Sequence, residues 1–333
     1  MKREVLLYLK NNPLEYVSGE QLSTLFGVSR TAIWKVINEL KREGYIIESS
    51  SKKGYRLSPD SDVLNSFEIS EELKTKVLGR NIIYFDQIDS TNNYAKRIAL
   101  EGSEEGTLVV ADCQTSGRGR LGRDWNSANK KGIWMSLVLR PDIPFEEVQM
   151  LTLAASVAVV QALDEMAEIK AGIKWPNDII INGKKVCGIL VEMNMEIESI
   201  NFLVLGIGLN VNQQKEDFPE ELSDKATSLK MHLETLGIRK NIKRSQLIAA
   251  ILLKFEAIYD KVKCGDFGYI ISEWKKHSVT LGREVSIIYK DRQYKGIAQD
   301  ITKDGKLIVE CEDGTVKEVF SGEVSVRGLL GYC

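Results

Sequence analysis

One run of the chain combines glycines and arginines in a way that suits anion binding. It covers residues 114–125 and reads QTSGRGRLGRDW. Glycines let backbone N–H groups approach an anion, and arginines supply fixed positive charge and planar donor forks. Trp125 adds a flat surface that could close over a ligand. The spacing fits neither a Walker A loop nor a dinucleotide-binding loop. Taken alone, the run is also compatible with a disordered basic loop or with RNA binding.

Three shorter segments could add groups to the same polar site. Residues 174–178 (KWPND) offer a lysine, an aromatic ring, an amide and a carboxylate around a proline-fixed turn. Residues 183–192 (GKKVCGILVE) place Lys185 at the mouth of an apolar strand, from which an ammonium can reach a phosphate or carboxylate. Residues 89–92 (DSTN) present small polar groups after a strand. In isolation such a sequence is more typical of a capped turn that opens a helix.

The elements expected around these segments form an α+β fold, a mixed sheet covered by helices. Residue types predict strands and helical periodicity predicts helices. The expected strands are 81–88, 106–113, 132–140, 186–193 and 200–211, and the expected helices are 93–100, 145–169 and 242–264. Residues 278–328 alternate in five short stretches, with turn signals at 290–291, 304–305 and 313–314. This pattern predicts a small SH3-like β-barrel.

Residues 1–57 predict a winged helix-turn-helix. Ser18 and Gln21 have the form of a capping box, Gly27 can end that helix, and Ser29 can cap a second helix that runs to about Glu43. A hairpin with a basic tip follows. The residues expected to meet phosphates and base edges are Ser29, Arg30, Thr31, Trp34, Lys35, Asn38, Lys52 and Lys53. A helical interaction module with a solvated basic face is the alternative.

Charge and composition narrow the possible functions. Residues 1–57 hold ten Lys and Arg against six Asp and Glu, whereas the rest of the chain holds 35 against 41, which suggests a polyanion partner for the head. Five cysteines without a CxxC pair, and only two histidines, argue against a zinc site, a disulfide framework and His-dependent nucleophilic catalysis. With no signal-peptide pattern and no apolar run judged long enough to span a bilayer, we expect a cytoplasmic protein without a membrane partner.

Residues 117–125, 174–178 and 185–192 together resemble the biotin protein ligase family in residue type, order and spacing. Residues 206–211 (GIGLNV) also look like a family segment that lines the nucleotide side. The resemblance covers essentially the whole chain, and a winged helix before this catalytic domain is similar to the bifunctional form that is both ligase and repressor. It implies a winged helix-turn-helix at 1–60, a linker at 61–80, a biotin- and ATP-binding domain at 81–276 and an SH3-like domain at 277–333.

The resemblance implies that biotin and ATP, with Mg²⁺, give biotinyl-5′-AMP, and that the biotinyl group then passes to a lysine of a biotin carboxyl carrier protein. It implies catalytic roles for Lys185, Arg118 and Arg120. The implied biotin-binding residues are Ser90, Thr91, Asn92, Gln114, Gly117, Arg118, Gly119, Arg120, Lys185 and Gly188. The implied ATP- or adenylate-binding residues are Arg120, Arg123, Trp125, Lys174, Asn177, Asp178, Gly206 and Asn210. Metal ligands are left open.

The same resemblance implies that the adenylate acts as a corepressor, favouring a homodimer that binds operator DNA. The strand at 189–193 could be a surface for the partner copy or the carrier, or it could be plain core. Three other functions compete: a lipoate-type ligase, a ligase whose head no longer binds DNA, and a ligand-sensing repressor that has lost its chemistry. The GRGRLGRDW run points away from the first, and an intact Lys185 argues against the last.

Overall fold

The computed structural model describes residues 1–196, 199–289, 292–320 and 325–328. The chain divides into two compact units. The first consists of Met1–Leu64 with Lys243–Ser245, and the second of Asn65–Ile242 with Gln246–Cys333. The predicted arrangement of a helical head, a central mixed sheet with helices and a C-terminal set of antiparallel strands is confirmed.

The first unit is built from three helices and a hairpin: α1 (Lys2–Asn11), α2 (Gly19–Phe26), α3 (Arg30–Arg42), β1 (Ile47–Ser50) and β2 (Gly54–Leu57). The predicted caps are present. Ser18 Oγ accepts from Gln21 N–H at 3.0 Å, and Gln21 Oε1 accepts from Ser18 N–H at 2.8 Å. Gly27 ends α2 in the left-handed region, and Ser29 Oγ accepts from Ala32 N–H at 3.1 Å. These caps fix both ends of the turn between α2 and α3.

The hairpin is attached to the chain just before α2. Val17 and Tyr55 exchange two backbone hydrogen bonds, each 2.8 Å long. Gly54 makes this approach possible, because a Cβ there would lie 2.1 Å from the carbonyl oxygen of Val17 and the residue has a φ of +104°. The wing is therefore held at its base, while its tip at residues 51–53 is exposed.

The second unit contains a seven-stranded sheet in the order β3-β4-β5-β9-β8-β7-β6. Its strands are β3 (Ile82–Phe85), β4 (Leu108–Ala111), β5 (Gly132–Leu139), β6 (Gly172–Lys174), β7 (Asp178–Ile181), β8 (Lys184–Glu196) and β9 (Ser199–Asn210). β3 and β4 are parallel, and every other neighbouring pair is antiparallel. The long central pair β8–β9 joins the two halves of the sheet.

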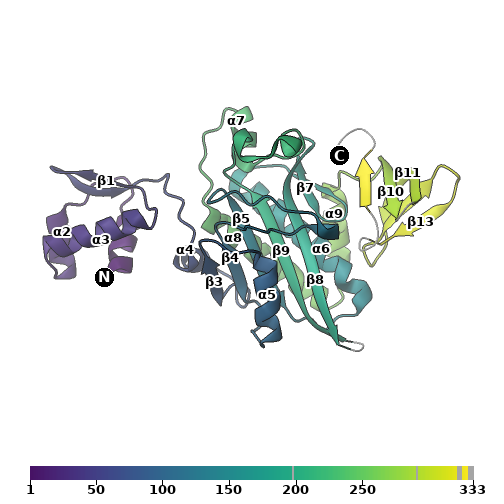
Figure 1. The fold of residues 1–333 in the computed structure, drawn as a ribbon, viewed down its shortest axis with the longest axis horizontal. Helices are drawn as coiled ribbons and strands as arrows, with labels where there is room; N and C mark the ends of the chain where they lie inside the picture. The colour runs from purple at the N-terminus through teal and green to yellow at the C-terminus, as the bar shows by residue number, and fades with distance from the viewer. Residues whose placement is uncertain (197–198, 290–291, 321–324, 329–333) are drawn as a thin grey trace. The chain divides into compact units, whose positions relative to one another are not determined.

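Helices cover this sheet. They are α4 (Ser66–Glu72), α5 (Thr91–Leu100), α6 (Val148–Ala167), α7 (Leu229–Thr235), α8 (Arg244–Lys263) and α9 (Gly268–His277). Figure 1 shows α5 lying over the sheet, with α6 behind it. The α5 side is packed with Ala95 and Ile98 from the helix against Val138 and Val204 from the strands. Alternate strand residues such as Leu205 point to the other face and are also buried.

Residues Phe145–Ala167 are long and apolar enough to cross a membrane, by length and composition only. The expectation that no run of the chain reaches that length is wrong by this measure. However, 78% of the 18-residue apolar window is buried inside the protein. The close packing is possible because alanines such as Ala154 and Ala158 keep the helix surface small. We interpret α6 as the central core helix of the sheet.

The C-terminal strands form a five-stranded antiparallel sheet in the order β13-β12-β11-β10-β14. They are β10 (Glu284–Tyr289), β11 (Arg292–Ile301), β12 (Leu307–Cys311), β13 (Val316–Val319) and β14 (Ser325–Gly328). The predicted turns at Gly305 and Gly314 are present, both glycines having positive φ. The turn predicted at residues 290–291 lies outside the described residues.

Several elements were not anticipated from the sequence. Helix α4 falls in the segment expected to connect two domains, and α7, α9, β6 and β7 were not assigned. The connecting segment is held firmly within the second unit, because the Glu256 carboxylate accepts the backbone N–H groups of Lys76, Val77 and Leu78 at 2.7–2.9 Å. Short apolar segments such as β6 carry too little periodicity to be assigned by pattern.

Candidate active site

A cavity of about 760 Å³ opens on the α5 side of the sheet. Its volume suits a small-molecule ligand site. The walls come from the glycine- and arginine-rich run at residues 114–125 (the Gly/Arg loop) and from residues 174–178 (the KWPND segment). Strands β8 and β9, the first turn of α5 and residues 218–226 complete them. Segments that are far apart in the sequence therefore meet around one space.

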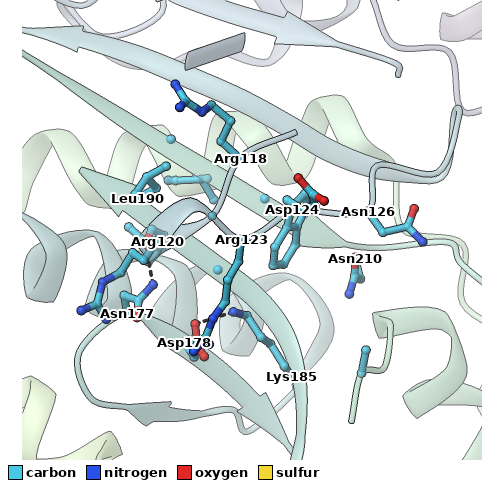
Figure 2. Close-up of a pocket in the computed structure, with 18 of the residues that line it drawn as sticks. Arg118, Arg120, Arg123, Asp124, Asn126, Asn177, Asp178, Lys185, Leu190 and Asn210 are labelled. Atoms are coloured by element: carbon cyan, nitrogen blue, oxygen red, sulfur yellow. Dashed lines mark hydrogen bonds and ion pairs between the residues drawn. The ribbon is translucent and has the colours of Figure 1, made fainter. Parts of the chain in front are cut away.

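The charged end of the cavity is built around two paired contacts. Lys185 Nζ lies 2.6 Å from Asp178 Oδ1, and Arg120 Nη1 donates to Asn177 Oδ1 at 3.0 Å. Figure 2 shows both contacts and shows Arg123 extending toward the Asp178–Lys185 pair. Burial lowers the pKa of the Arg120 guanidinium, the charge of Asp178 opposes that shift, and Arg123 adds to it. Three cationic groups are thus held near one carboxylate.

The Trp125 ring packs against two glycines of the sheet, Gly188 and Gly208. Gly188 and Gly208 are register partners on β8 and β9. A Cβ at Gly188 would lie 2.8 Å from the Trp125 ring, and one at Gly208 would lie 2.6 Å from it. Lys185 Nζ lies 5.1 Å from the centroid of the same ring, close enough for a cation–π contact. No larger residue at either glycine would leave room for the indole in this position.

The opposite end of the cavity carries uncharged hydrogen-bonding groups. Gln114 Oε1 accepts from Thr91 N–H at 2.8 Å and lies 3.0 Å from Thr91 Oγ1, while Gln114 Nε2 donates to Ser127 Oγ at 2.8 Å. Ser90 caps α5, so its hydroxyl is held at the helix start. Such an end suits a neutral polar head group, in contrast to the cationic end.

The KWPND segment is held from both sides. Trp175 donates its indole N–H to the Gly305 carbonyl at 3.1 Å and its backbone N–H to Thr280 Oγ1 at 2.9 Å. Asn177 Nδ2 donates to the Ile189 carbonyl at 2.8 Å. The C-terminal sheet and β8 therefore fix the turn that presents Asp178 to the cavity.

The structure brings nearly all of the predicted pocket residues to this cavity. Its lining includes Ser90, Thr91, Asn92, Gln114, Arg118, Gly119, Arg120, Arg123, Trp125, Lys174, Asn177, Asp178, Lys185, Gly188, Gly206 and Asn210. Gly117 is not among the lining residues. It lies beneath the loop, where its carbonyl accepts from Trp125 N–H at 2.9 Å and a Cβ would lie 2.6 Å from the Trp125 carbonyl oxygen. Arg118 points away from the Asp178–Lys185 pair (Figure 2) and donates to Asn93 Oδ1 at 3.1 Å.

Two predicted residues line the cavity but are committed to internal contacts. Asn210 donates to the Thr227 carbonyl at 3.1 Å and accepts from Gln213 at 3.0 Å. Asn92 Nδ2 donates to a Glu192 carboxylate oxygen at 2.8 Å. The wall residues that sequence reasoning missed include Trp134, Met135, Phe218, Leu222 and Ala226. Gly208 also lines the cavity and belongs to the GIGLNV segment that was expected on the nucleotide side.

The predicted nucleic-acid surface is exposed on the first unit. On α3, Arg30, Thr31, Trp34 and Lys35 are exposed and Asn38 is half-buried, while the apolar stripe of the helix is buried. Lys52 and Lys53 are exposed at the wing tip. The donors therefore lie on the solvent side of α3, as a recognition helix requires.

Among the described residues, no group of three or more His, Cys, Asp or Glu side chains could hold a metal ion. The cavity does offer the carboxylates of Asp124, Asp178 and Asp224. Mg²⁺ is typically held by one or two carboxylates together with substrate phosphates. The residues present therefore fit a magnesium ion that arrives with a nucleotide, and not a preformed all-protein site.

Comparisons with protein families agree with this geometry along the chain. The family described as "Biotin/lipoate A/B protein ligase family" matches residues 84–210, "HTH domain" matches residues 2–56, and "Biotin protein ligase C terminal domain" matches residues 280–327. The three parts of the fold thus define a protein ligase core that carries a helix-turn-helix head and a C-terminal β domain.

Similar proteins match this chain over most of their length. The chain is 44% identical over 312 residues to "Bifunctional ligase/repressor BirA" of Bacillus subtilis, covering 94% of each chain, and 30% identical over 313 residues to the protein of that name from Escherichia coli, again covering 94% of each. Among solved structures, a biotin protein ligase from Aquifex aeolicus in complex with biotin and ATP matches with a TM-score of 0.64 and 34% identity, over 75% of this chain and 99% of that one. The chain belongs to the family of bifunctional biotin protein ligases and repressors.

Proposed function

We propose that this protein joins biotin to ATP to form biotinyl-5′-AMP, and then transfers the biotinyl group to a lysine of a biotin carboxyl carrier protein. The observation that carries the proposal is the division of one cavity into two ends. Neutral hydrogen-bonding groups around Thr91 and Gln114 lie at one end, and the Arg120, Arg123 and Lys185 cations lie at the other. A ligand with a polar ring and a carboxylate fits between them, with a phosphate at the cationic end.

In the first step, a biotin carboxylate oxygen attacks the α-phosphorus of ATP. An O–P bond forms to the carboxylate, the bond from that phosphorus to the bridging oxygen breaks, and pyrophosphate leaves. Both reactants are anions, so fixed positive charge lowers the barrier more than an acid–base pair would. Lys185 would contact the carboxylate and the α-phosphate together, and Arg118 and Arg120 would add positive charge from the loop. Asp178, at 2.6 Å, holds the Lys185 ammonium in place.

The remaining lining residues divide between the two substrates. For biotin we propose Ser90, Thr91, Asn92, Gln114, Gly117, Gly119 and Gly188 in addition to Arg118, Arg120 and Lys185. For the adenylate we propose Arg123, Trp125, Lys174, Asn177, Gly206 and Asn210 in addition to Arg120 and Asp178. Trp125, seated on Gly188 and Gly208, closes the loop over the mixed anhydride and shields it from water. Asp124, Asp178 or Asp224 would hold Mg²⁺, which when bound would neutralise part of the phosphate charge.

In the second step, the neutral ε-amine of the carrier lysine attacks the acyl carbon. A C–N bond forms, the C–O bond to AMP breaks, and the ammonium proton is released to solvent. The cationic end then holds the departing AMP phosphate. Because the phosphate of the mixed anhydride lies at the cationic end, the incoming amine must reach the acyl carbon beside the Arg120 and Lys185 cations.

The head supplies the second function. We propose that Ser29, Arg30, Thr31, Trp34, Lys35, Asn38, Lys52 and Lys53 contact operator DNA, and that biotinyl-5′-AMP favours a homodimer that presents two heads. The domain boundaries at residues 60, 80 and 276 and a cytoplasmic location are part of the same proposal. A reducing compartment is consistent with cysteines that are all free among those described.

Two measurements test the proposal. Pyrophosphate release should require both ATP and biotin, should stop when Mg²⁺ is chelated, and should not be supported when lipoate replaces biotin. A gel shift on the DNA upstream of biotin genes should strengthen when biotin and ATP are added, and should weaken when an acceptor carrier domain consumes the adenylate. Pyrophosphate release with ATP and lipoate but not with ATP and biotin would contradict the assignment as a biotin ligase. A gel shift that does not respond to biotin would contradict the proposed coupling between adenylate formation and DNA binding.

A further inference from the structure

Glu192 lies at the end of a hydrogen-bonded chain that starts at the cavity wall. It follows Leu190 by two residues on β8, so both side chains lie on the same face of the sheet. One Glu192 carboxylate oxygen accepts from Lys96 Nζ at 2.5 Å, and the other accepts from Asn92 Nδ2 at 2.8 Å. Glu192 itself is not part of the cavity lining. Its influence on a ligand must therefore pass through Asn92.

From Asn92 the chain continues inward through two hydroxyl groups. Asn92 Oδ1 lies 2.6 Å from Ser136 Oγ, and Ser136 Oγ lies 2.8 Å from Thr91 Oγ1. Thr91, Asn92 and Ser136 are 3%, 5% and 0% exposed, so bulk water does not compete for these bonds. Gly206 lets the amide pack on β9, because a Cβ there would lie 2.2 Å from Asn92 Oδ1.

The donors and acceptors available on each side chain fix the direction in which hydrogens are donated along this chain of hydrogen bonds. A carboxylate only accepts hydrogen bonds, so Asn92 turns its NH₂ group toward Glu192 and its carbonyl toward Ser136. That carbonyl also only accepts, so Ser136 gives its single hydroxyl hydrogen to Asn92 Oδ1, the shorter of its two contacts. Ser136 then has no hydrogen left for Thr91. The Thr91 oxygen consequently receives no hydrogen from Ser136.

The Gln114 side of Thr91 leads to the same result. Gln114 Nε2 is directed to Ser127, so Gln114 presents its carbonyl oxygen to Thr91. A carbonyl oxygen gives no hydrogen to the Thr91 hydroxyl. Thr91 Oγ1 thus faces two neighbours, Ser136 and Gln114, neither of which supplies it with a hydrogen. Its lone pairs are open to a donor that arrives with the ligand.

We propose that Glu192 is a positioning residue for the adenylation reaction: by fixing the direction of this chain, it keeps Thr91 Oγ1 as a hydrogen-bond acceptor for an N–H group of the biotin ureido ring. The inference rests on the proposed function. A ureido ring has two N–H donors and one carbonyl acceptor, so its site needs acceptors as well as donors. Glu192 supplies the acceptor at a distance, without touching biotin.

The substitution Glu192→Gln tests the direction of the chain without changing its shape. The introduced amide can donate to Asn92 Oδ1, which lets Asn92 turn over. Asn92 Nδ2 then donates to Ser136, so this bond reverses its direction. Ser136 can now donate its hydrogen to Thr91, and Thr91 donates its own hydrogen to Gln114. In that arrangement Thr91 already accepts a hydrogen from Ser136 and loses an acceptor site for the ligand.

We expect Glu192→Gln to raise the KM for biotin about tenfold, the loss of roughly one hydrogen bond of ~1.4 kcal/mol, with kcat and the KM for ATP nearly unchanged. The matched control is Lys96→Met. It removes the ion pair of Glu192 but keeps the carboxylate and its bond to Asn92, so the KM for biotin should stay within twofold of wild type, roughly the measurement error. If Glu192 acts only as half of an ion pair, the two variants will behave alike, and the proposal is wrong.

The double variant Glu192→Gln/Ser136→Ala gives the sharper result. Without the Ser136 hydroxyl, the reversed chain can no longer donate to Thr91, so the biotin KM should return toward the wild-type value. A purely structural role predicts that the double variant is worse than either single one, which would overturn the proposal. The wild-type protein in the same pyrophosphate assay distinguishes failure of the proposed function from failure of the Glu192 proposal. If the wild type shows no biotin-dependent turnover, the proposed function itself is wrong.

Discussion

The cavity and the predicted DNA-binding surface are assembled in different ways. The cavity takes its lining from residues as distant as Ser90 and Ala226, and its half-buried cations Lys185 and Arg120 are held in an ion pair and a hydrogen bond. The surface of the first unit comes from one helix and one hairpin, and its cations on α3 and the wing tip are exposed. Charge in the cavity is therefore preorganised, whereas charge on the head is solvated and open to screening by salt.

This difference predicts that single substitutions act strongly in the cavity and weakly on the head. A preorganised charge in a site that excludes water has no substitute when it is lost. On the head, each exposed cation would make one of several contacts to DNA phosphates. When one cation is lost, neighbouring cations and salt ions compensate for part of the lost binding free energy. The predictions below test this contrast, beginning with the largest expected effect.

Lys185→Ala should lower the rate of adenylate formation on the order of 100-fold, which corresponds to about 3 kcal/mol of transition-state stabilisation. The melting temperature should change little, since Lys185 is half-buried at the cavity and is not part of the core. The measurement is biotin-dependent pyrophosphate release under saturating substrates. Lys184→Ala is the matched control, because Lys184 is the adjacent strand residue and does not line the cavity. Equal loss in both variants would contradict the assignment.

Gly208→Ala should reduce adenylate formation by about tenfold, because displacement of a closing group by a few tenths of an ångström or more weakens alignment. The added Cβ would lie 2.6 Å from the Trp125 ring, so the loop must move outward. Faster proteolysis of residues 115–125 should accompany the effect. Gly268→Ala is the control, since a Cβ there meets only Asp266 at 3.9 Å. If the Gly208→Ala loop is as resistant to proteolysis as the wild-type loop when biotinyl-AMP is bound, Trp125 does not depend on packing against Gly208.

Lys35→Ala should weaken operator binding modestly and lower the slope of log affinity against log salt by about one, the effect of losing one phosphate contact. Pyrophosphate release should be unaffected. Lys10→Ala provides the comparison, because Lys10 lies on α1 and not on the exposed face of α3. If both substitutions change the slope equally, α3 is not the recognition surface.

The two regions also differ in what their sequences could reveal. The caps Ser18, Gln21 and Ser29 were predicted correctly because capping depends on neighbours within three residues. Lys185 and the Gly/Arg loop were assigned through residue type and order within single segments. These signals are local, and most of the residues that they pointed to line one cavity.

What the sequence could not reveal depends on pairing across the sheet. Gly188 faces Gly208 only because β8 and β9 pair in one register, and the Trp125 seat exists only in that register. Glu192 on β8 bonds to Asn92 on α5, 100 residues away in the sequence, and Trp175 donates to Gly305, 130 residues away. Contacts of this kind arise from tertiary packing and leave no periodic pattern in the chain.

The smallest effect is expected at the wing, where Glu48 accepts from Tyr16 Oη and from Arg56 Nη2, the latter at 2.8 and 3.0 Å. The hydrogen bond from Tyr16, followed by that from Arg56, holds the pKa of Glu48 below its ordinary value. Because the folded pKa is the lower one, the stabilisation is present above the unfolded pKa of about 4.3 and is lost as pH falls through the folded pKa.

Glu48→Gln should therefore differ from wild type in melting temperature most at neutral pH, and the difference should vanish in acid. Tyr16→Phe is the matched variant, since it removes the leading cause and should move the Glu48 pKa back toward its ordinary value in a carboxyl NMR titration. Biotin-dependent turnover should not follow this titration, because the wing and the cavity belong to separate compact units. A parallel fall of turnover and Glu48 ionisation would break the contrast between a preorganised cavity and a locally built head.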